Sequence, residues 1–85
     1  MKLKNGFITH ETDGEQIMVA ADGSFAGMVR SNATAAFIVD CLKTETNEDE
    51  ILDKMMVKYT GDIMAMADDI KMVIGKLRKI GAIDE

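Results

Sequence analysis

The stretch DIMAMADDIKMVIGKLRKIGAI, residues 62–83, carries the longest regular pattern in this sequence. Its apolar side chains recur at steps of three and four residues, which places them on one stripe of an α-helix. The opposite side is polar, so this helix is expected to bury one face and expose the other. Gly81 follows the pattern where a left-handed helix end is expected, and Ala82 and Ile83 can then fold back onto the core. The stripe consists of Met66, Ile70, Val73, Ile74, Leu77 and Ile80.

Two Asp-Gly pairs, at residues 13–14 and 22–23, divide the first part of the chain into segments of strand-like composition. Asp-Gly readily supplies the positive φ angles of a tight hairpin. We therefore expect a three-stranded antiparallel meander. Its strands are predicted at residues 6–12, 16–21 and 24–30.

The two edges of this meander are not equally protected against pairing with another strand. The first strand carries His10 and Glu11, whereas the third has a single charge, Arg30, at its far end. Charged edge strands resist the addition of a further strand, so the third strand is the less guarded edge. The sequence leaves open whether the helices of the fold cover this edge or whether it stays free for an added strand.

Capping residues indicate two helices between the meander and residue 62. Asn32 is a good N-cap for a helix at residues 33–43. Either Thr46 or Asn47 caps a second helix that runs to about Tyr59, and Asp62 can cap the third. The second helix is expected to bury Ile51, Leu52, Met55, Met56 and Tyr59. The predicted fold class is α+β and winged-helix-like, a three-stranded antiparallel β-meander followed by three α-helices, in a single domain over residues 1–85.

Composition restricts the function. Of the 85 residues, 47% are apolar and 29% charged, a globular balance. A single cysteine cannot form an internal disulfide, no apolar run reaches the length of a membrane span, and we expect a cytoplasmic protein with no membrane partner. The net charge of −5 argues against non-specific binding of nucleic acid, which depends on lysine and arginine.

Catalytic and metal-binding patterns are not evident in the sequence. The chain has one histidine, His10, and one cysteine, Cys41, on different predicted elements. Cys41 shares an apolar stripe with Phe37, Ile38 and Leu42, which is typical of a buried thiol. Phosphate-binding, dinucleotide-binding and zinc-binding motifs are absent from the sequence. We therefore expect a protein that is not an enzyme and that uses no cofactor or metal.

Several motifs resemble the PqqD-like family over essentially the whole chain. They are the Asp-Gly hairpin, the segment GMVRSNATA at residues 27–35, an acidic helix that ends in Tyr59, and the spacing from Asp69-Ile70 to Leu77 and to GAI at residues 81–83. The resemblance implies a recognition element for ribosomally synthesised peptides. Such an element binds the leader of a precursor peptide and presents the precursor to a modifying enzyme, often a radical SAM protein.

The resemblance also implies a binding mode and a set of site residues. The leader would add as a strand to the third strand and lie in the groove between that strand and the third helix, an arrangement in which backbone pairing gives affinity and side chains give specificity. On the helix we favour one margin of the apolar stripe, although Ile74 and Arg78 bound the other. Lys76 and Lys79 would attract an acidic leader. The predicted peptide-binding residues are Phe25, Ala26, Gly27, Met28, Val29 and Arg30 of the strand and Asp69, Met72, Val73 and Lys76 of the helix.

Two other interpretations remain open from the residues alone. The second and third helices could form a helix-turn-helix that binds DNA, with the strands as the wing. Against this, the second helix is acidic and the bases of the third helix lie toward its C-terminal half. In the other interpretation the protein is a structural or oligomerising subunit, a homodimer formed through the edge of the third strand.

Overall fold

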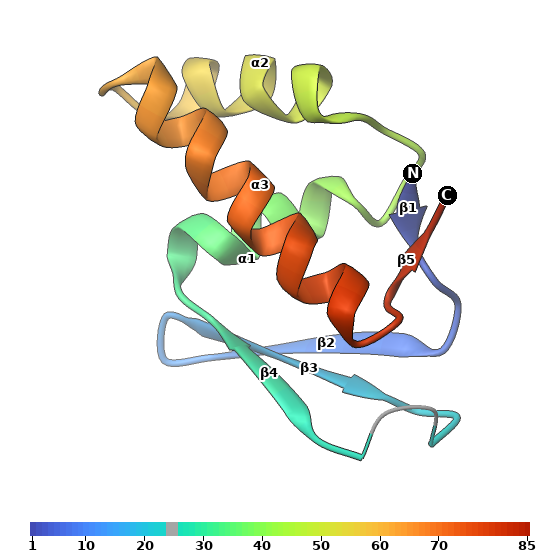
Figure 1. Ribbon diagram of the computed structural model, residues 1–85. Helices are drawn as coiled ribbons and strands as arrows, with labels where there is room; N and C mark the ends of the chain where they lie inside the picture. Colours follow the sequence, from blue (N-terminus) through green and yellow to red (C-terminus); the bar gives the residue numbers. More distant parts are fainter. Residues whose placement is uncertain (24–25) are drawn as a thin grey trace.

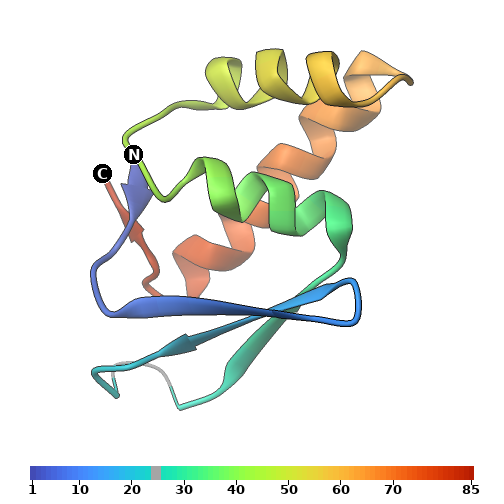
Figure 2. The same ribbon diagram turned by 180° about the vertical axis from the view of Figure 1, so that it is seen from behind.

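The computed structural model describes residues 1–23 and 26–85 and shows an α+β fold (Figure 1). A three-stranded sheet forms one layer, α1 and α3 lie against one of its faces, and α2 lies farthest from the sheet (Figures 1 and 2). The predicted meander followed by three helices is confirmed. The elements are β1 Lys2–Leu3, β2 Phe7–Thr12, β3 Glu15–Ala20, β4 Met28–Ser31, α1 Ala33–Cys41, α2 Glu48–Lys58, α3 Ile63–Lys79 and β5 Ile83–Asp84.

The first predicted hairpin is confirmed at Asp13-Gly14. Strands β2 and β3 pair antiparallel up to Thr12 opposite Glu15, and both residues of the connecting turn have positive φ, 47° at Asp13 and 79° at Gly14. This is the conformation that a two-residue hairpin matched to the twist of its strands requires, and Asp-Gly adopts it readily. The alternation along β3 then buries Gln16 and Met18 beneath the helices.

The predicted third strand, residues 24–30, is wrong at its start. Strand β4 is Met28–Ser31, Ala26 and Gly27 lie in the bend before it, and Ser24 and Phe25 lie outside the described residues. Pairing with β3 begins at Val19 opposite Met28. Alanine and glycine offer little side chain to pack on a sheet, so the ladder forms only where Met28 and Val29 supply it.

Side-chain caps fix the helix starts. The side chain of Asn32 accepts a hydrogen bond from the backbone N–H of Ala35 at 2.9 Å, and that of Asp62 accepts one from Met64 at 3.0 Å. For α2 the cap is Asn47 rather than Thr46, because the Asn47 side chain accepts from the Glu50 N–H at 2.9 Å. Both capping alternatives considered for α2 nevertheless contribute, since the Thr46 hydroxyl hydrogen-bonds the Glu50 carboxylate at 3.0 Å.

The core lies between the sheet and the three helices. The amphipathic stripe of α3 is confirmed at its centre, where Met66, Ile70, Ile74 and Leu77 are buried. One methionine differs from expectation, because Met56, predicted on the buried face of α2, is 45% exposed. The core residues are Leu3, Phe7, Met18, Ile38, Val39, Cys41, Leu42, Ile51, Met55, Met66, Ile70, Ile74, Leu77, Ala82 and Ile83.

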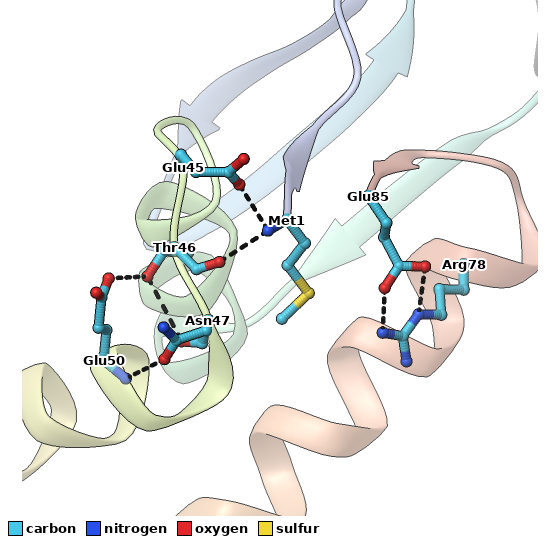
Figure 3. A network of polar contacts seen from close by, with 7 residues as sticks. All are labelled: Met1, Glu45, Thr46, Asn47, Glu50, Arg78 and Glu85. Atoms are coloured by element: carbon cyan, nitrogen blue, oxygen red, sulfur yellow. Dashed lines mark hydrogen bonds and ion pairs between the residues drawn. The ribbon is translucent and has the colours of Figure 1, made fainter.

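A second, two-stranded sheet, which the sequence did not predict, joins β1 to β5 beside the helices (Figure 1). Gly81, with φ of 74°, ends α3 and turns the chain so that Ala82 and Ile83 fold back onto the core, as predicted. Figure 3 shows the polar contacts around this sheet, where the Met1 ammonium lies 2.6 Å from the Glu45 carboxylate. Within the described residues, no helix has the length and apolar character needed to cross a membrane.

Candidate functional site

Strand β4 is an edge of the main sheet. The strand order β2-β3-β4 leaves β4 with one sheet neighbour, β3. Its side chains alternate between the two faces, because Val29 packs against the core and Ser31 is buried, whereas Met28 and Arg30 are exposed on the opposite face. A strand at an edge retains backbone N–H and C=O groups that can pair with a further strand.

A groove of about 280 Å³ lies beside the C-terminal end of this edge strand. Its walls come from three elements: the junction of β4 and α1, the first turns of α1, and the middle of α3. Met72 is 54% exposed on the α3 wall, and Ile38 of α1, which is fully buried, lies at the bottom. The lining residues are Arg30, Ser31, Asn32, Thr34, Ala35, Ile38, Asp69, Met72, Val73 and Lys76.

The groove combines apolar and charged walls. Met72 and Val73 supply apolar surface above the buried Ile38. Arg30 and Lys76 supply positive charge, and Asp69 supplies negative charge. The four α3 residues lie three and four positions apart, so they form one continuous margin of the helix. An extended peptide placed here would meet apolar side chains with charges at either side.

The structure brings five of the ten predicted site residues together in this groove: Arg30, Asp69, Met72, Val73 and Lys76. Met28 and Val29 lie on the adjacent strand but do not line the groove. Ala26 and Gly27 lie in the preceding bend, and Phe25 lies outside the described residues. The alternative margin of α3 differs, because Ile74 is buried in the core and Arg78 pairs with Glu85.

Sequence reasoning missed the α1 wall of the groove. The sequence indicates Asn32 as a helix cap, Ile38 as part of an apolar stripe and residues 34–35 as part of a family motif, but it assigns none of them to the binding site. Only a weak feature of the sequence indicates this wall. The small residues that open α1 allow close approach of a neighbouring chain, but only the packing of α1 against α3 shows which side of the helix faces the groove.

Residues with catalytic potential do not converge in the described part of the chain. His10 is exposed on β2, whereas Cys41 is buried at the end of α1. Burial raises the pKa of the Cys41 thiol, which keeps it protonated and weakly nucleophilic. No group of three histidine, cysteine or acidic side chains suited to a metal ion occurs among the residues that the structure describes.

Comparisons with known proteins give a family and two similar folds. The family model described as "Coenzyme PQQ synthesis protein D (PqqD)" matches residues 15–83. A comparison with curated proteins gives no match. Two solved structures share the fold. The structure described as "TbiB1 in Complex with the TbiA(beta) Leader Peptide" matches with a TM-score of 0.82 and 17% sequence identity, over 99% of this chain and 95% of that chain. The structure described as "Lasso peptide synthetase B1 complexed with the leader peptide" matches with a TM-score of 0.76 and 18% sequence identity, over 95% of this chain and 93% of that chain.

Proposed function

Because this chain belongs to the PqqD family, whose model matches residues 15–83, we propose that it binds the leader of a ribosomally synthesised precursor peptide. The observation that carries the proposal is the groove between the edge strand β4, α1 and α3. Support also comes from the two proteins of similar fold, both of which are described as complexes with leader peptides. The peptide adds as a strand to β4, and its side chains enter the groove.

Backbone pairing alone would give weak binding. A four-residue strand presents about four outward backbone groups, because alternate residues point to each side. Each hydrogen bond contributes only about 0.5–1.5 kcal/mol net, and ordering the peptide opposes binding. A micromolar complex requires about 8 kcal/mol. Side-chain contacts with Met72 and Val73 therefore supply much of the affinity, since burial of one large apolar side chain contributes about 1.5–3 kcal/mol.

In this proposal the protein is not itself a catalyst. It holds the leader so that the remainder of the precursor reaches a separate modifying enzyme, a radical SAM protein or another peptide-modifying enzyme. When this protein docks on the enzyme, its hold on the leader raises the effective concentration of the core at the enzyme. The protein should therefore accelerate modification of a precursor that carries its leader and have no effect on a leaderless core.

The proposed mode can be tested with backbone-methylated leader peptides. N-methylation removes an amide donor and leaves the side chain unchanged. Two peptides are compared by calorimetry, each methylated at alternate residues of the bound segment. In one peptide the methylated amides are those that would point toward β4, and in the other they are those that would point away from it. Strand addition predicts that one peptide loses binding and the other retains it, because alternate amides point to opposite sides of a strand.

Equal binding of the two methylated peptides would contradict strand addition. The unmodified peptide and a peptide of the same composition in scrambled order are the controls. If both methylated peptides bind as well as the unmodified one, the groove alone holds the leader and β4 is not its partner.

A further inference from the structure

A second and larger cavity, of about 460 Å³, lies on the other side of α1 from the peptide groove. The groove meets Thr34, Ala35 and Ile38 of α1, whereas this cavity meets Ala33, Phe37 and other residues of the opposite side. It is enclosed by the turn between β2 and β3 below and by the C-terminal end of α2 above, where Lys58 and Tyr59 line it. Figure 2 shows the hairpin, α1 and α2 stacked in this order.

The cavity wall contains a buried acceptor that lacks a donor. Gln16 is 1% exposed, and its Nε2 donates to Asp40 Oδ1 at 3.0 Å. A carboxylate can only accept a hydrogen bond, so this contact fixes the orientation of the amide and directs Oε1 elsewhere. Gln16 Oε1 has no hydrogen-bond partner among the described residues. An orphaned acceptor of this kind is unfavourable unless something supplies a donor.

The charge of the cavity favours a cation. Four carboxylates line it, those of Glu11, Asp13, Glu15 and Asp40, against one base, Lys58. Asp40 also contacts the Lys43 ammonium at 2.9 Å, which leaves the three carboxylates of the hairpin as the main source of negative potential. The field of several like charges around a concave surface attracts ions of the opposite sign.

The aromatic wall already accommodates a cation from this chain. Phe37 and Tyr59 pack edge to face with their ring centroids 5.8 Å apart. The Lys58 ammonium lies 5.0 Å from the Phe37 centroid and 5.7 Å from the Tyr59 centroid. The rings are therefore placed where a positive group gains a cation–π interaction.

We propose that this cavity binds the guanidinium group of an arginine side chain presented by a partner protein. Guanidinium carries five N–H donors in one plane, which suits the carboxylates and the amide oxygen of the cavity because these acceptors lie in different directions. The flat face of the group can also stack on the aromatic rings. The guanidinium takes the place of the Lys58 ammonium over the rings, with one N–H donating to the Glu15 carboxylate and another to Gln16 Oε1. Free arginine fits less well, because the hairpin carboxylates repel its α-carboxylate. The inference does not depend on the peptide groove.

The test is an NMR titration of the isotope-labelled protein with Nα-acetyl-arginine amide, whose only charge is the guanidinium. We expect saturable shifts of the Gln16 side-chain amide and the Phe37 ring, with no such shifts from the neutral citrulline counterpart. Absence of saturable shifts at these groups would overturn the proposal. Equal shifts with the citrulline compound would also overturn it, because binding would then not require the positive charge.

Variants locate the site. Replacing the exposed Glu15 with glutamine removes one charge and should weaken binding about fivefold to tenfold, as expected for loss of one charge-assisted hydrogen bond. Gln16→Met removes the orphaned acceptor and should weaken binding by a similar factor. Asp53→Asn, at an exposed position of α2 outside the cavity lining, is the charge-matched control and should bind as the parent does. Equal affinity of Glu15→Gln and Asp53→Asn overturns the assignment, even if Gln16→Met fails to fold.

Discussion

At the scale of single residues, Gly6 has a conformational requirement that Gly75 does not share. Gly6 has φ of 97°, and a Cβ there would lie 2.8 Å from the Asp22 carboxylate. Gly75 lies inside α3, and a Cβ there would meet nothing within 4 Å. The positive φ is itself an obstacle to a side chain at residue 6, because L-residues disfavour this conformation.

These two glycines give opposite predictions for the same substitution. Gly6→Ala should lower the free energy of unfolding by about 1–2 kcal/mol, because L-residues disfavour positive φ. Gly75→Ala should raise it by about 0.5–1 kcal/mol, because alanine is the better helix former. Urea unfolding measures both. A stabilising Gly6→Ala would show that the loop before β2 does not have this conformation.

Met72 and Met64 are a matched pair on α3 for testing the peptide groove. Both are exposed, Met72 by 54% and Met64 by 73%, but Met72 lines the groove and Met64 does not. Met72→Asp places a carboxylate against the bound peptide and should weaken leader binding about tenfold or more, because an unpaired charge is then desolvated. Met64→Asp should leave the affinity unchanged. Calorimetry with one leader peptide tests both, and equal losses would remove Met72 from the site.

At the scale of elements, the pair Arg78–Glu85 connects the end of α3 to the residue after β5. Hydrogen bonding to Arg78 lowers the pKa of the Glu85 carboxyl. The stabilisation that this pair gives is therefore present above the pKa of Glu85 in the unfolded chain and disappears as the pH falls through the lower pKa of the folded state. Both side chains are about half exposed, so the effect is small and sensitive to salt.

Glu85→Gln should consequently lower the melting temperature at pH 7 by a small amount, and the difference from the parent should disappear as the pH falls through the lowered pKa of Glu85. Asp53→Asn on α2 is the control for loss of a carboxylate at an exposed position. A difference for Glu85→Gln that persists unchanged at low pH would mean that the side chain stabilises β5 by packing and not by its charge.

Residues with a local role made much of the fold predictable from the sequence. Asn32 and Asp62 begin helices and Gly81 ends one through contacts within their own turns. The start of β4 is set by its pairing with β3, and the Asp22-Gly23 pair does not indicate where that pairing begins. The sheet of β1 and β5 was not predicted, because two-residue strands such as Lys2–Leu3 carry no periodic pattern and form only when α3 brings the chain ends together.

The candidate site also combines features that depend on local sequence with features that depend on long-range packing. Helical spacing places Asp69, Met72, Val73 and Lys76 on one margin of α3, because residues on one helix keep their relation in any fold, but only the family resemblance implies that this helix borders a peptide groove. The α1 wall could not be found from spacing, since it depends on how α1 and α3 pack. The same limit applies to the larger cavity, where Gln16 and Asp40 come from elements 24 positions apart in the chain.

At the scale of the whole molecule, the charge distribution fits a peptide better than DNA. The first turn of α2 is acidic, with Glu48, Asp49 and Glu50. The start of α3, where a recognition helix would contact nucleobases, presents the exposed Ile63 and Met64. The basic residues of α3 lie farther along, three of them in its last turn. Phosphate contacts require basic groups at the docking surface, which this arrangement does not provide at the expected place.

The edge of β4 makes self-association a competing use of the same surface. Two copies that pair through this edge would form a continuous sheet across a two-fold axis. A leader peptide that adds to β4 would occupy the backbone groups needed for that contact. Any concentration-dependent dimer should therefore dissociate when the leader binds.

The central claim is that β4 and the adjacent margin of α3 bind a leader peptide. The most direct test is an amide NMR titration of the labelled protein with leader peptides of precursors encoded beside its gene. Leader binding at this site should give saturable shifts concentrated at Met28–Ser31 and along Asp69 to Lys76 on α3, with little change in β2 or at the start of α2. Shifts centred on β2 or on α2, or no shifts with any of these peptides, would contradict it.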